Sequence, residues 1–232
     1  MQDIVAPRPL SRSRLYWPFG LLALLAAGWT GFWFYAANRV ETTLAAWLER
    51  EASHGRVWTC PQRAVGGYPF RIEASCASPT FSGPAGGRSV SGSLAGLKAY
   101  AQAYQPNLIL ADLDGPLKLA DEDGGTTEIS WTRLRLSLRG RPRSLERLSI
   151  EGADMTLTAR RGDQMLFDMR AAGLEAHARQ SPQRADNAYD LALDLRQAVV
   201  PALDIALGLP EPADVAFAGT STHLVLSETG GL

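Results

Sequence analysis

The most hydrophobic part of the chain is a long run near its start. Residues 15–37, LYWPFGLLALLAAGWTGFWFYAA, contain no charged side chain. At the helical rise, this run is long enough to cross about 30 Å of hydrocarbon. Its aromatic residues gather near both ends, as is typical of the two membrane interfaces. They are Tyr16, Trp17 and Phe19, then Trp29, Phe32, Trp33, Phe34 and Tyr35. We therefore predict a transmembrane helix at residues 15–37, embedded in the lipid bilayer.

Basic residues precede this run more often than they follow it. Arg8, Arg12 and Arg14 stand before it, and loops with an excess of Lys and Arg stay in the cytoplasm. Residues 1–14 are therefore predicted to be a cytoplasmic tail, with the rest of the chain outside. The alternative is a cleaved secretory signal, but such a signal ends in small residues. Bulky aromatic residues end this run, which favours a retained anchor.

Residues 38–56 have the period of an amphipathic helix. Val40, Leu44, Trp47 and Leu48 recur at spacings of three and four, with Glu and Arg between them. We predict a stalk helix packed on the following domain. A position on the lipid surface is less consistent with the sequence, because the polar side is acidic as well as basic.

The remaining segment, residues 57–232, changes to the period of two that is typical of half-buried strands. In FRIEASC, apolar side chains alternate with polar ones, which predicts Phe70 and Ile72 in the core. Before this strand stand two glycines that suit a tight turn, and Pro69 favours an extended Tyr68 at the strand start. The motif is predicted to form a hairpin corner and consists of Gly66, Gly67, Tyr68, Pro69, Phe70 and Arg71.

Alternation and turn residues predict that a meander of strands follows. Turns are expected at 114–115, 121–125 and 160–164, and parity shifts near Trp131 and Gly152 suggest bulges. Other segments are predicted as follows: a Gly/Ser-rich loop at 82–93, a possible loop helix at Leu94 to Tyr104, one strand at 128–140, a strand at 188–196, a short helix near Pro201, and last strands at 214–219 and 222–227. Either the sheet ends on an exposed edge or the natural chain is longer. The predicted fold class is an N-terminal transmembrane helix plus a mainly-β (α+β) extracytoplasmic domain, a curved antiparallel meander sheet with a stalk helix and one or two short helices.

The chain has two cysteines, Cys60 and Cys76, which flank the predicted hairpin. The predicted topology places both outside the cytoplasm, where thiols become oxidised. We therefore favour a disulfide over two free buried thiols. Closing a loop of this length is worth roughly 3 kcal/mol in the chain-entropy model.

No pattern of residues predicts catalysis, a cofactor or a metal. Gly219 to His223 approaches a nucleophile elbow, but His223 replaces the second glycine. GPAGGRS lacks the spacing and the lysine of a phosphate-binding loop. The three histidines are far apart, and turn chemistry explains the acidic run near Asp121. The formal net charge of −1 gives no reason to expect nucleic acid as a partner.

Several strands carry one wholly apolar face, which is the basis of the functional hypothesis. If helices cover that face only in part, lipid or an envelope protein is the expected partner. The alternatives are a closed core, a scaffold that recruits a protein through a sheet edge, and, less favoured, a membrane-surface enzyme. The candidate residues are Leu134, Leu136, Leu138, Met155, Leu157, Leu191, Leu193 and Leu195.

The order of these features resembles a known family. A basic start, one span and a stalk precede Trp58, Cys60, Pro61, the segment 67–71 and Cys76. This arrangement resembles the domain of unknown function 2125 (DUF2125) family of Gram-negative bacteria and, more distantly, envelope proteins of the AsmA type. The resemblance implies a single-pass inner-membrane protein with a periplasmic domain, and an association with lipid traffic. It implies no catalytic residues.

Overall fold

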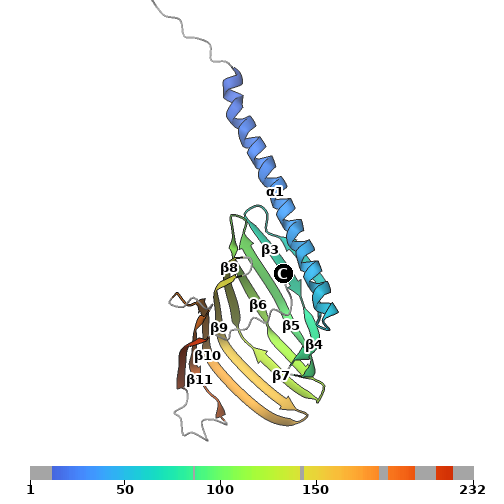
Figure 1. The fold of residues 1–232 in the computed structure, drawn as a ribbon, viewed down its shortest axis with the longest axis vertical. Helices are drawn as coiled ribbons and strands as arrows, with labels where there is room; N and C mark the ends of the chain where they lie inside the picture. Colours follow the sequence, from blue (N-terminus) through green and yellow to red (C-terminus); the bar gives the residue numbers. More distant parts are fainter. Residues whose placement is uncertain (1–11, 86, 142–143, 183–187, 202–212, 222–232) are drawn as a thin grey trace, which may run out of the picture.

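The fold consists of one long helix and a single large antiparallel sheet (Figure 1). It is seen in a computed structural model that describes residues 12–85, 87–141, 144–182, 188–201 and 213–221. Helix α1, Arg12–Ser53, precedes all the strands. The predicted class, a long apolar helix followed by a mainly antiparallel β domain, is confirmed.

Helix α1 runs without interruption through both of the helices predicted from the sequence. Pro18 lies in its second turn, where it removes one backbone hydrogen bond, the one to the Arg14 carbonyl. One stripe of its second half is buried or half-buried, with spacings of three and four residues that keep it on one side of the helix. This stripe comprises Trp33, Ala37, Val40, Leu44 and Leu48. The predicted stalk is thus the continuation of the apolar helix, and it packs on the sheet through β1, β2 and β3.

The sheet has twelve strands. Their bounds are β1 Val57–Thr59, β2 Gln62–Gly66, β3 Arg71–Ala77, β4 Thr80–Ala85, β5 Arg88–Gln102, β6 Gln105–Asp121, β7 Gly125–Ser130, β8 Arg133–Arg141, β9 Ser144–Arg161, β10 Gln164–Gln180, β11 Tyr189–Ala198 and β12 Ala213–Ser221. All the pairings are antiparallel, so the predicted meander is confirmed in outline.

Long strands in this sheet are bordered by pairs of short strands placed end to end. Strand β5 pairs with β4 through residues 88–93 and with β3 through residues 96–102. In the same way, β7 and β8 lie in line between β6 and β9. The prediction of one strand at 128–140 was therefore wrong, because the chain bends at Trp131 and Thr132 and starts a second strand.

Three other predictions in the first half of the sheet were wrong, and glycines contributed to two of them. Strands β4 and β5 occupy residues 82–85 and 88–102, where a loop at 82–93 and a helix at Leu94 to Tyr104 were expected. Likewise, Asp114 and Gly115 lie inside β6 and form no turn. The cause is packing against aromatic rings: a Cβ on Gly92 would overlap the Phe81 ring, and one on Gly115 would lie 3.1 Å from the Trp131 ring.

The later predictions agree better with the structure. Turns at 121–125 and 160–164 are present, and the strands at 188–196 and 214–219 correspond to β11 and β12. Near Gly152 the apolar side chains change from even-numbered to odd-numbered positions, as the sequence indicated. The change coincides with Asp154, which has a φ of 51° within the continuous strand β9. Most of the helix expected near Pro201 and the strand expected at 222–227 lie outside the described residues.

The hairpin corner between β2 and β3 is present, with two corrections. The Gly67 φ is 99°, and the Arg71 N–H donates to the Gly67 carbonyl at 3.1 Å. Pro69 lies in the turn after a cis peptide bond and does not begin the strand, since β3 starts at Arg71. Phe70 is 66% exposed and is not a core residue. The turn carries it past the end of the sheet, where no strand covers it.

The predicted disulfide is present. Cys60 and Cys76 are joined, with their Cα atoms 5.7 Å apart. The bond ties the segment between β1 and β2 to the end of β3, and no cysteine of the described chain is free. It therefore fixes the edge of the sheet on which helix α1 packs.

We expect Gly67→Ala to lower the free energy of unfolding by about 1–3 kcal/mol, because it forces an L-residue into a positive φ. Its Cβ would also lie 2.7 Å from the Arg71 carbonyl oxygen. Gly66→Ala is the matched control, since a Cβ there meets nothing within 4 Å. Chemical denaturation of the full chain in detergent gives both values. Equal stability of the two variants would contradict this account of the turn.

Thiol labelling before and after reduction tests the disulfide. We expect labelling only after reduction, and a Cys60→Ser/Cys76→Ser variant should fold with its stability lowered by about 3 kcal/mol. Strong labelling of the unreduced protein, with no loss of stability in the double variant, would show that the bond does not form.

Candidate functional site

One face of the sheet is apolar across seven neighbouring strand positions. Directly paired residues of antiparallel strands lie on the same face, so the register identifies its members. Three adjacent cross-strand rows contain only apolar residues and glycine. They are Cys76–Leu97–Leu113–Leu134–Gly152–Leu174–Leu195, Ala74–Ala99–Ala111–Leu136–Ile150–Ala176–Leu193 and Ile72–Ala101–Ile109–Leu138–Leu148–Ala178–Leu191. We call this surface the apolar face.

The structure brings six of the eight candidate residues into these rows. Those of β8, Leu134, Leu136 and Leu138, are separated from those of β11 by β9 and β10, whose apolar residues complete each row. Leu191, Leu193 and Leu195 are the members from β11. The alternation of each strand was visible in the sequence, whereas the pairing that aligns the rows was not.

Met155 and Leu157 belong to the continuation of this surface. The Met155 sulfur lies 2.8 Å from the position of a Cβ on Gly152, and its side chain packs with Leu174. Met155 is only 8% exposed and is therefore unavailable to a ligand. Leu157 is half-buried in a further row, which consists of Leu94, Leu117, Ile129, Leu157 and Met169.

The apolar face is only partly shielded from solvent within the described chain. Its large side chains are mostly half-buried, and Leu138 and Ile109 are 37% and 39% exposed. No large side chain among the described residues is fully buried. Neighbouring side chains in one layer shield one another, but full burial needs a second layer. The described residues supply such a layer only at one end.

That covered end lies under helix α1, along the edge of the sheet (Figure 1). The Trp47 ring contacts Trp58, and Trp58 stacks on Phe81, with centroid distances of 5.8 and 5.1 Å. Just after the helix, Arg56 Nε and Nη2 donate to the two carboxylate oxygens of Glu51, the second at 3.0 Å. These hydrogen bonds lower the pKa of the Glu51 carboxyl. Within the described part of the chain, helix contacts reach β1, β2 and β3 and no other strands.

The opposite face of the sheet is polar. Its central row is Ser75–Lys98–Asp112–Arg135–Glu151–Glu175–Asp194. Arg135 donates to Asp112 at 2.8 Å, which raises the pKa of the guanidinium. A shallow depression of about 900 Å³ lies farther along this face, lined by Ser and Thr hydroxyls with Lys118, Glu128 and Arg160. These ion pairs and hydroxyls suit a surface in contact with water.

One polar pair on this face was not predicted from the sequence. His177 Nδ1 lies 3.0 Å from Ser149 Oγ, and Glu175 is 3.9 Å from the other ring nitrogen. This approach follows from register, since Ser149 and His177 are paired directly across β9 and β10. The carboxylate is beyond hydrogen-bond distance, and the neighbouring backbone N–H groups belong to the strand ladder. The arrangement therefore lacks the geometry of an acyl-transfer site. Among the described residues no cluster of ligands suits a metal ion.

The turn between β2 and β3 docks on helix α1. Trp29 Nε1 donates to the Pro69 carbonyl at 2.9 Å, and Trp33 Nε1 donates to the Arg71 carbonyl at 2.8 Å. The Tyr68 hydroxyl lies 2.9 Å from Thr30 Oγ1. The residues of the motif were identified from the sequence, but their partner was missed. The available signal was the spacing of Trp29 and Trp33, which places both indoles on one side of a helix.

Comparison with known proteins gives one match. A family model described as an uncharacterized protein conserved in bacteria (DUF2125) covers residues 33–229. Neither the curated proteins nor the solved structures contain a match to the chain. The matched region includes the second half of α1 and the whole sheet, which confirms the resemblance to DUF2125 noted from the sequence. The chain therefore belongs to the DUF2125 family.

Proposed function

We propose that this DUF2125 protein is a membrane-anchored lipid-binding protein of the bacterial envelope. Helix α1 anchors it in the inner membrane, the sheet stands in the periplasm, and the apolar face binds acyl chains. The observation that carries the proposal is the set of three apolar rows, which the described residues cover only at the end beneath α1.

The first half of α1 supports the anchor. It belongs to a helix that is long and apolar enough to cross a membrane. Its side chains make few contacts with the rest of the protein, and Leu22, Leu24 and Trp17 are 65%, 70% and 72% exposed. Such a surface is stable in hydrocarbon but not in water. The arginines before the run favour a cytoplasmic N-terminus and a periplasmic sheet.

The dimensions and chemistry of the apolar face fit acyl chains. Seven strands spaced about 4.8 Å apart make it about 29 Å wide, roughly twice the length of one chain in a leaflet about 15 Å thick. Ala74, Ala99 and Ala111 adjoin one another in the middle row. The adjacent rows hold Cys76, Leu97 and Leu113 on one side and Ile72, Ala101 and Ile109 on the other, so Ala101 joins these alanines in a low strip.

The rows offer no charged group and no side-chain hydroxyl or amide to recognise a polar ligand. Binding there depends on the burial of apolar surface, which is non-directional. A methylene chain meets that requirement without losing hydrogen bonds, whereas an extended peptide would need partners for its own backbone groups. The distant resemblance to AsmA-type proteins points in the same direction.

The test is cross-linking of a photoactivatable fatty acid to the full chain in detergent, with mass spectrometry to locate the labelled peptides. We expect labels on β5, β6, β8 and β11. Leu136→Asp should reduce labelling of these strands at least about tenfold, since a buried unpaired charge costs more than 1.4 kcal/mol. Ser137→Asp is the matched control, because it adds the same charge to the polar face of the same strand.

Both variants should keep the melting behaviour of the parent protein, because Leu136 and Ser137 are only half-buried. Equal labelling of the two variants, or labelling confined to α1, would refute acyl-chain binding by the apolar face. A third outcome is no lipid labelling together with stoichiometric self-association, or stoichiometric binding of another protein. If Leu136→Asp abolished that association, the occupant of the apolar face would be a protein.

A further inference from the structure

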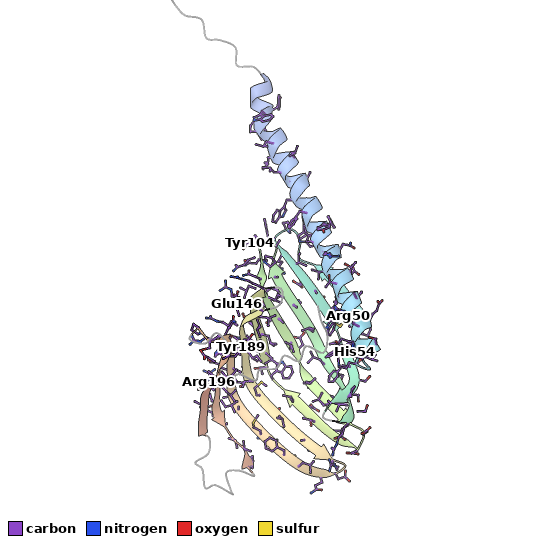
Figure 2. The ribbon with its side chains drawn as sticks, viewed as in Figure 1. Arg50, His54, Tyr104, Glu146, Tyr189 and Arg196 are labelled. Carbon is purple, nitrogen blue, oxygen red and sulfur yellow. A yellow bond between two sulfur atoms is a disulfide. The ribbon has the colours of Figure 1, made fainter. Side chains whose placement is uncertain are left out.

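Two hairpin tips lie beside α1 at a level within its apolar run. The tips are residues 67–70, between β2 and β3, and residues 103–104, between β5 and β6. The Ala103 N–H donates to the Phe70 carbonyl at 2.9 Å and joins them. Figure 2 shows Tyr104 at the end of the sheet nearest to the middle of the helix. The first tip meets α1 at Trp29, which binds the Pro69 carbonyl, and Trp33 binds the adjoining Arg71 carbonyl. These two tryptophans precede the end of the run, Ala37, by about 6–12 Å along the helix axis.

Most backbone carbonyls of the first tip accept hydrogen bonds, which suits a water-poor environment. Three of its carbonyls, and the Arg71 carbonyl directly after it, accept bonds from within the protein. The donors are Arg71 N–H to Gly67, Trp29 Nε1 to Pro69, Ala103 N–H to Phe70, and Trp33 Nε1 to Arg71. In a turn exposed to water such bonds are dispensable, but at membrane depth each unpaired polar group costs several kcal/mol.

The aromatic side chains of the two tips are largely exposed, although the Tyr68 ring also packs against Trp33 and its hydroxyl lies beside Thr30. Tyr68, Phe70 and Tyr104 are 53%, 66% and 68% exposed. Neither tip contains a charged residue. The first charge is Arg71, which is paired with Glu73 at 3.1 Å. Exposed aromatic residues with a polar group suit the interface between headgroups and acyl chains.

We propose that these tips insert into the leaflet on the periplasmic side of the membrane, with Tyr68, Phe70 and Tyr104 in contact with lipid. The partner of this surface is the bilayer itself. The row of the apolar face that starts at Ile72 and Ala101 comes directly after the tips, so that face opens onto the leaflet. Acyl chains thereby reach it without crossing water, a consequence that rests on the proposed lipid-binding function.

Single-cysteine probes test the insertion. The two native cysteines are joined, so one added cysteine is the only thiol to react with an environment-sensitive fluorophore. The full chain is labelled at Tyr104→Cys, at Leu22→Cys inside the proposed span, and at Asp163→Cys. Asp163 lies in the turn between β9 and β10, at the opposite end of the sheet. Each protein is placed in phosphatidylcholine–phosphatidylglycerol vesicles that contain acyl-chain nitroxide lipid.

The nitroxide should quench most of the emission at Tyr104→Cys and Leu22→Cys and little at Asp163→Cys. Quenching at Leu22→Cys alone would refute the insertion while leaving the anchor intact. Absence of quenching at Leu22→Cys would refute the anchor, and the insertion with it. An intact disulfide and parental melting of each variant confirm that the probes report the native fold.

Discussion

An antiparallel sheet with one largely apolar face requires a cover for that face, and this requirement shapes the whole protein. Three rows across seven strand positions are apolar, and the opposite face carries the ion pairs. Helix α1 covers the edge at β1 to β3. The large side chains beyond it remain half-buried in the described chain. A second protein layer would make an ordinary core, whereas acyl chains would make a lipid-binding surface.

Helix α1 contains the apolar run and also packs on the sheet. A shorter helix joined to the sheet by a flexible linker would separate these two roles. Because α1 is continuous through Ser53, the position of the sheet relative to the apolar run is set by direct contacts. Two indole donors hold the β2–β3 turn, and Trp47, Trp58 and Phe81 fix the other end of the contact. The disulfide reinforces the same edge. The sheet is therefore held close to the apolar run of α1, with its first apolar row next to the hairpin tips.

Much of this arrangement was predictable from period and charge. The apolar run, the stripe from Val40 to Leu48 and the alternation of β8 and β11 reflect local rules. The glycines of β5 and β6 misled, because small residues next to aromatic rings look like turns when the partner ring is unknown. Phe70 was assigned to the core because alternation does not indicate where a strand begins. Strand register and the docking of Trp29 and Trp33 depend on contacts between residues distant in sequence. The local pattern of apolar and polar residues does not encode such contacts.

The central claim is that the apolar face is covered by lipid acyl chains. Methyl-selective NMR of the full chain in lipid nanodiscs tests it most directly, through nuclear Overhauser effects from the methyl groups of Leu136 and Leu193. The account predicts cross-peaks from these methyls to acyl-chain methylene protons, and none from exposed methyls on the polar face such as that of Ala192. Cross-peaks from Leu136 and Leu193 to protein protons alone would show that a second protein layer covers the rows, and would contradict the account.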